Sequence, residues 1–205
     1  MYVLVFFVCF FLISLGMPKF YVFIIVFVLV FSSFAPYFYS LLRETRINRL
    51  EQFLIKQQKN PNLYLCYLMA NNRTTEAEAL LEKLLAKHKN PTRKALYTAM
   101  YAVHQKNTAA IRNVLTDLPA GQFRSYYEAV VCVWEGNLEE ASRLTATLSK
   151  PWMRDIVLSE IELSKGNRHE AIAYARQAWL ACRGLQRYVS YKTYERDLPE
   201  ALTGS

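Results

Sequence analysis

The first 42 residues differ from the rest of the chain in their pattern of hydrophobic and polar positions. Two runs rich in Val, Leu, Ile and Phe, residues 1–16 and 20–42, flank a short link with Lys19, the one charged side chain in this part. As helices, the runs would be roughly 24 Å and 34 Å long, against a bilayer core of about 30 Å. Gly16 and Pro18 favour a turn between them. The pattern therefore predicts a hairpin of two transmembrane helices in residues 1–42.

A secretory signal peptide is the alternative interpretation of residues 1–16. Such a peptide begins with a basic segment and is followed by a cleavage site of small residues, as in Ala-x-Ala. Neither feature accompanies this run. The membrane hairpin is therefore the favoured interpretation.

Basic side chains follow the second apolar run closely. They are Arg43, Arg46, Arg49, Lys56 and Lys59. Loops rich in Lys and Arg normally stay on the cytoplasmic side of a membrane. We therefore expect a multi-pass protein of the cell membrane, of the bacterial inner-membrane type, with its polar part in the cytoplasm. Residues 43–60 are expected to form a basic juxtamembrane linker helix, attracted to anionic membrane lipid by about 1 kcal/mol per basic residue.

The overall charge is positive, with 25 Lys and Arg against 17 Asp and Glu and a formal net charge of +8. These charges are spread along the chain, and no nucleic-acid-binding motif accompanies them. The expected partners are therefore a protein, which the sequence does not identify, and membrane lipid, but no nucleic acid.

Helical periodicity dominates the polar part. Leu80, Leu81, Leu84 and Leu85, for example, recur at the three- and four-residue spacing of one helix face. Short polar segments with Asn interrupt this pattern, and Pro61, Pro91 and Pro151 stand where a helix can begin. The sequence predicts an all-α fold with about four helix pairs: 61–70 with 74–88, 92–105 with 108–118, 122–135 with 138–149, and 152–165 with 168–182.

The same short motif occurs twice in the second half of the chain. EGNLEEA occupies residues 135–141, and KGNRHEA follows at residues 165–171. Weaker counterparts centre on Ala77 and Ala110, so that the alanines at 77, 110, 141 and 171 are 33, 31 and 30 residues apart. A repeat near this length is typical of stacked helix pairs.

The turn Gly followed by Ala five residues later resembles the tetratricopeptide repeat (TPR) family. That resemblance covers roughly residues 59–182, strongly in the last two pairs and weakly in the first two. It implies a TPR-like α-solenoid in residues 61–182, which the apolar runs would anchor to the membrane. It gives a packing role to Ala77, Ala110, Gly136, Ala141, Gly166 and Ala171. The first two pairs lack the turn glycine, and Pro91 and Pro151 lie slightly off the family register. An irregular helical bundle is the alternative.

In such repeats the first helix of each pair lines an extended concave surface. The family register selects these residues for that groove: Asn62, Cys66, Met69, Ala95, Phe123, Tyr126, Val130, Ile156 and Glu160. Most are apolar or aromatic, which favours a partner helix or an extended apolar segment. The alternative is that some of these side chains belong to the core.

No catalytic, cofactor-binding or metal-binding constellation stands out. His88, His104 and His169 lack the spacing of a zinc-protease helix, and no glycine-rich phosphate loop is present. The cysteines show no CxxC or other ligand spacing, so we expect them to be small, buried apolar side chains. We therefore expect neither an enzyme nor a cofactor.

In the tail, residues 183–205, tyrosines recur at helical spacing at Tyr188, Tyr191 and Tyr194. We expect this segment to form a helix that caps the end of the solenoid. The sequence as a whole predicts a membrane-anchored scaffold or adaptor for protein–protein interaction, with a cytoplasmic TPR-like domain. The alternative function is an accessory or regulatory subunit of a membrane enzyme or transporter complex.

Overall fold

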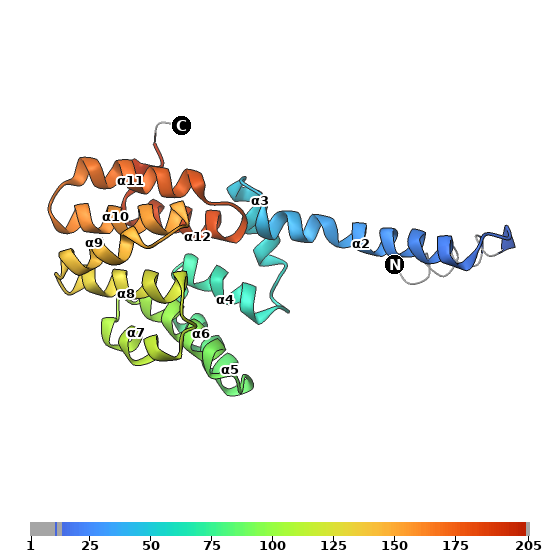
Figure 1. The fold of residues 1–205 in the computed structure, drawn as a ribbon, viewed down its shortest axis with the longest axis horizontal. Coiled ribbons are helices and arrows are strands. Elements are labelled where there is room, and N and C mark those ends of the chain that lie inside the picture. Colours follow the sequence, from blue (N-terminus) through green and yellow to red (C-terminus); the bar gives the residue numbers. More distant parts are fainter. Residues whose placement is uncertain (1–10, 12–13, 204–205) are drawn as a thin grey trace.

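The computed structural model describes residue 11 and residues 14–203. In that part every regular element is a helix: eleven α-helices, α2 to α12, and two short 3₁₀ helices, η1 and η2. The prediction of an all-α protein is therefore confirmed. Figure 1 shows a long helix, α2, that projects from a body formed by the other helices.

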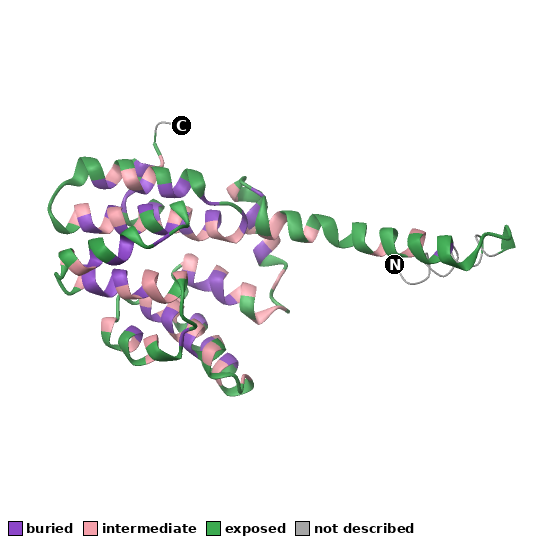
Figure 2. Ribbon diagram, in the orientation of Figure 1, coloured by how far each residue is buried: buried purple, intermediate pink, exposed green. Residues whose placement is uncertain are grey.

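Helix α2, Lys19–Leu42, is the apolar helix expected from the second hydrophobic run. It is the one helix in the described residues that is long and apolar enough to cross a membrane. At 1.5 Å per residue its 24 residues extend about 36 Å. Val22 is its single buried residue, and the helix is almost wholly exposed in Figure 2. The first predicted span, residues 1–16, lies mostly outside the described residues, so the hairpin remains a prediction.

The eight helices of the predicted pairs are all present. Their bounds are α4 Pro61–Ala70 with α5 Thr74–Lys87, α6 Pro91–His104 with α7 Thr108–Val114, α8 Gln122–Trp134 with α9 Leu138–Ala146, and α10 Pro151–Ser164 with α11 Arg168–Ala181. The 3₁₀ helix η1, Leu115–Asp117, continues α7. Each helix contacts the next one along the chain, and α8 also contacts α10.

The turns inside the four pairs share one backbone conformation. Asn72, Lys106, Gly136 and Gly166 have φ values of 55°, 52°, 82° and 81°. In each turn this residue donates its backbone N–H to the carbonyl three residues earlier, and the next residue donates to the carbonyl five residues earlier, at 2.8–3.0 Å. This is the Schellman ending of a helix, which favours glycine because a side chain is strained at positive φ. The first two pairs make the same turn without glycine.

The small residues after these turns are buried between helices. Ala77, Ala141 and Ala171 are 0% exposed and follow the left-handed residue by five positions. The equivalent position in the second pair is Ile111, also 0% exposed, whereas Ala110 is half-buried. The packing position is therefore one residue later than the sequence alignment placed it in that pair.

The C-terminal helix α12, Gly184–Asp197, connects the two ends of the domain. It packs on α11, as a cap would, and it also contacts α2, α3 (Ile47–Ile55) and α4. Tyr188 is fully buried against Leu50 and Leu54 of α3. Its hydroxyl accepts a hydrogen bond from Asn71 Nδ2 at 2.8 Å. In Figure 1, α12 lies beside α3 and behind α10, and η2 (Pro199–Ala201) follows it.

The end of α2 is fixed to the start of α12. The backbone N–H of Gly184 donates to Glu44 O at 2.8 Å. A Cβ atom at Gly184 would lie 1.9 Å from Leu41 O, so only glycine permits this approach. The apolar helix therefore joins the domain through a tight backbone contact between residues far apart in the sequence.

Candidate protein-binding surface

The residues predicted to line a groove differ in their exposure. Asn62 and Phe123 are exposed, and Tyr126, Ile156 and Glu160 are half-buried. The remaining four are buried in the core: Cys66, Met69, Ala95 and Val130. These four buried side chains are therefore not available to line a groove in this structure.

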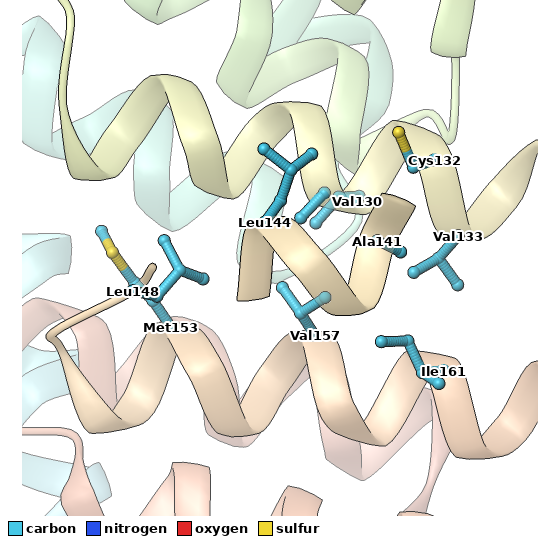
Figure 3. Packing of buried hydrophobic residues seen from close by; sticks show 10 residues of the cluster. Val130, Cys132, Val133, Ala141, Leu144, Leu148, Met153, Val157 and Ile161 are labelled. Carbon is cyan, nitrogen blue, oxygen red and sulfur yellow. The ribbon is translucent and has the colours of Figure 1, made fainter. Parts of the chain in front are cut away.

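The buried members lie between helices because neighbouring elements cover both sides of the first helix of a pair. Val130 belongs to a cluster with Ala141 and Leu144 of α9 and Val157 of α10, and Figure 3 shows it inside that packing. Cys66 packs in another cluster with Ala77 of α5. Burial raises the pKa of the Cys66 thiol to about 11, which keeps it protonated near neutral pH.

Four side chains at the starts of α8 and α10 form what we call the aromatic patch: Phe123, Tyr126, Trp152 and Ile156. Phe123 and Tyr126 are three positions apart on α8, and Trp152 and Ile156 are four apart on α10, so each pair shares a helix face. The rings of Tyr126 and Trp152 have centroids 6.0 Å apart. Phe123 is 42% exposed. Aromatic side chains of this kind are enriched among the residues that dominate protein–protein binding.

A cation adjoins the patch. Lys150 Nζ lies 4.8 Å from the centre of the Phe123 ring, a cation–π arrangement. The family register did not select Lys150 or Trp152, although Trp152 is the second residue of α10, as the selected Phe123 is of α8. The signal that could have found them is the helix-start sequence Lys150-Pro151-Trp152.

The side chain of Gln122 forms hydrogen bonds next to the patch. Gln122 Oε1 accepts from the backbone N–H of Ser149 at 2.6 Å and from its hydroxyl at 3.0 Å. Gln122 Nε2 donates to Thr147 O at 3.2 Å. These bonds tie the start of α8 to the loop before α10 and so restrain the two helix starts that carry the patch.

The other predicted groove residues are engaged elsewhere. Asn62 Oδ1 accepts the Tyr97 hydroxyl at 2.6 Å, on α4 and α6. Glu160 Oε2 accepts Trp134 Nε1 at 3.2 Å. Asn62 therefore belongs to a separate polar contact, and Glu160 is a structural acceptor between α8 and α10.

Helix α12 covers part of the same side of the domain. Burial raises the pKa of Tyr194 well above its ordinary value, and Tyr126, Glu160 and Asp155 contribute to the same shift. These groups are thus close enough to interact, although they come from three different helices. Among the residues predicted to line the groove, Phe123 is the exposed large hydrophobic side chain, whereas Tyr126 and Ile156 are half-buried.

Titratable and thiol side chains show no shared site in the described part of the chain. Among residue 11 and residues 14–203, no group of three or more His, Cys, Asp or Glu could hold a metal ion. Cys66, Cys132 and Cys182 are free and buried. The chain matches no protein-family model, and neither a curated protein nor a solved structure matches it.

Proposed function

We propose that this protein is a membrane-anchored module for protein–protein interaction, in which α2 crosses the membrane and the packed helices present the aromatic patch in the cytoplasm. The observation that carries the proposal is the direct attachment of an unburied apolar helix to a domain of packed helix pairs. Val22 alone is buried among the 24 residues of α2. An apolar surface of that extent requires a covering, and a bilayer supplies one.

The energetics of insertion support anchoring. Each Leu, Ile, Phe or Val contributes about −0.3 to −0.6 kcal/mol near the bilayer centre. Helix α2 is composed mostly of such residues and carries one charge, Lys19, at its first position. Insertion is therefore favourable by several kcal/mol. The basic residues after Leu42 favour a cytoplasmic domain.

The four equivalent turns support a TPR-like array. Gly136 and Gly166 occupy the position that the family reserves for glycine, and Asn72 and Lys106 adopt the same left-handed conformation. Repeats that share a turn geometry and a buried small residue stack in one direction and expose a long surface. The described part of the chain contains four pairs with this turn in succession, and three of them have a buried alanine five residues after the left-handed residue.

The aromatic patch favours a helical or extended apolar partner. Phe123 and Trp152 supply rigid apolar area, while Lys150 adds a cation at its edge. A partner helix with an apolar face and a nearby carboxylate would complement this surface.

Site-specific photo-crosslinking in native membranes tests this proposal. A photoreactive residue at Phe123 should give a discrete crosslinked protein, and the Trp152→Ala substitution should reduce its yield. Leu180 on α11 is the matched control, because it is also an exposed apolar residue, at 46% against 42% for Phe123. The same product from both positions, or no protein product from either, would contradict the assignment of the patch.

An accessory subunit of a membrane complex is the second candidate function. The rings of Phe23, Phe27 and Phe31 stack along one face of α2, with centroids 6.4 Å and 5.8 Å apart. Such a stripe could pack on another membrane helix. Under this function, Phe27→Leu should lower co-purification with the complex while Phe123→Ala leaves it unchanged.

A further inference from the structure

Exposed cations surround the cytoplasmic end of α2. Arg43, Arg46, Arg49, Lys56 and Lys59 follow the helix in the sequence, and all are exposed. The fold adds a sixth, Arg183, from the junction of α11 and α12. We call these six residues the basic collar.

The backbone contact at Gly184 brings Arg183 to α2. Because the N–H of Gly184 is bound to Glu44 O at 2.8 Å, the preceding residue is held next to the end of the membrane helix. Arg183 is exposed, and its Nη1 donates to Leu180 O and Cys182 O. The Nε and Nη2 groups of this guanidinium therefore remain available for an external acceptor.

Contacts around Tyr37 restrain the other side of the collar. Its hydroxyl accepts from Asn60 Nδ2 at 3.4 Å, and its ring lies 5.4 Å from that of Phe53. Leu50 and Leu54 bury the inner face of α3. Lys56 and Lys59 are thus attached to a segment that packs on α2, not to a free linker.

The carboxylates near the collar are committed to internal contacts. Glu44 is buried and accepts the backbone N–H groups of Thr45 and Arg46 at 2.9 Å and 3.0 Å. Its nearest approach to Arg49 is 3.7 Å. Glu51 accepts the Tyr188 hydroxyl at 3.1 Å. The collar consequently keeps most of its positive charge.

Four arginines elsewhere in the chain make a contrast. Arg73, Arg112, Arg143 and Arg168 each form an ion pair with a glutamate. Arg43, Arg46 and Arg183 have no ion pair with any residue that the structure describes, and the same holds for Lys56 and Lys59. Five of the six collar residues therefore have no ion pair within the described part of the chain.

We infer that the basic collar binds the phosphate groups of anionic lipid headgroups and so seats the domain against the membrane surface. The inference rests on the proposed membrane anchoring by α2. Phosphate is recognised by guanidinium and ammonium groups, and the collar supplies four arginines and two lysines. The collar begins directly after the apolar helix, which ends at Leu42. An inserted helix would meet the lipid headgroups there, so a lipid is a better occupant than free phosphate.

Lipid titration of the full chain tests the inference. Native mass spectrometry in mild detergent would measure the binding of phosphatidylglycerol and phosphatidylcholine with identical acyl chains. We expect tighter binding of phosphatidylglycerol. Arg46→Gln and Arg183→Gln should each weaken it about fivefold, the factor that corresponds to about 1 kcal/mol per basic residue, and leave phosphatidylcholine unchanged. Arg183→Lys, which keeps the charge, should restore most of the affinity.

Arg93→Gln is the matched control, because Arg93 is an exposed, unpaired arginine on α6, away from α2. Equal binding of the two lipids by the wild type, or an equal loss in Arg93→Gln, would overturn the inference. Displacement of the lipid by inorganic phosphate at equal concentration would overturn it in favour of a free-phosphate site. Retention of every variant in carbonate-washed membranes separates this result from anchoring: loss of the wild type from the membrane would instead contradict the proposed function.

Discussion

Replacement of Gly184 by Ala should destabilise the protein more than any comparable change at a turn glycine. Gly184 has a φ of 55°, and a Cβ atom there would lie 1.9 Å from Leu41 O and 2.8 Å from Leu42 N. The left-handed conformation alone costs a non-glycine residue about 1–2 kcal/mol. The overlap with backbone atoms adds about 1–3 kcal/mol, because α2 and α12 must move apart.

Gly166→Ala separates these two contributions. Gly166 has a φ of 81°, and nothing lies within 4 Å of a Cβ atom built there. It therefore carries the conformational cost without the overlap. Urea unfolding of the full chain in mild detergent, followed by circular dichroism, would compare the two variants. Gly184→Ala should be less stable than Gly166→Ala by about 1–3 kcal/mol. Equal stability would refute the tight contact between α2 and the C-terminal helix.

Three other predictions follow from packing, turn conformation and charge, and urea unfolding measures each. Ala141→Leu should cost about 1–3 kcal/mol, because Ala141 is 0% exposed between helices, whereas Ala146→Leu on the exposed side of α9 should change stability by less than about 0.5 kcal/mol. Lys106→Gly should stabilise by roughly 0.5–1 kcal/mol, since the strain at its φ of 52° exceeds the added flexibility of glycine in the unfolded chain; a loss of stability would contradict the shared turn. The pKa of Glu44 is held below 4.5 chiefly by the hydrogen bond from the Arg46 N–H. Because the folded-state pKa is the lower one, this carboxylate stabilises the fold above pH 4.5, and the stabilisation is lost as the pH falls through the lowered pKa. Glu44→Gln should therefore be destabilising at pH 7, with a difference from wild type that shrinks in acid; a difference that does not change with pH would contradict this role.

The helices could be predicted from the sequence because their signals are local. Periodic leucines, first-turn prolines and polar turns define each helix within a short window, and neighbouring pairs pack in sequence order. The second pair shows where this fails. Its left-handed residue is Lys106, which carries no composition signal, so an alignment on alanine selected Ala110 although Ile111 occupies the buried position.

The candidate surface was only partly predictable for a different reason. Whether Cys66 or Val130 faces a groove or the core depends on which helices cover both sides of α4 and α8. That covering includes α12, whose partners on α3 and α4 lie more than a hundred residues earlier in the chain. Phe123 and Tyr126 were selected by the family register. Arg183 was not predicted as part of the basic collar, because it joins the collar through a long-range backbone contact at Gly184 that no local sequence pattern predicts.

The most direct test of the account is the placement of the two ends of α2 on opposite sides of the membrane. Single cysteines at Lys19 and Asn113 would be introduced after replacement of the four native cysteines by alanine. A membrane-impermeant maleimide would then be applied to spheroplasts of a bacterial host. We expect labelling of Lys19→Cys in intact spheroplasts and labelling of Asn113→Cys, on the exposed surface of α7, only after permeabilisation. Equal labelling of both cysteines in intact spheroplasts, or protection of both, would show that α2 does not span the membrane in the proposed orientation.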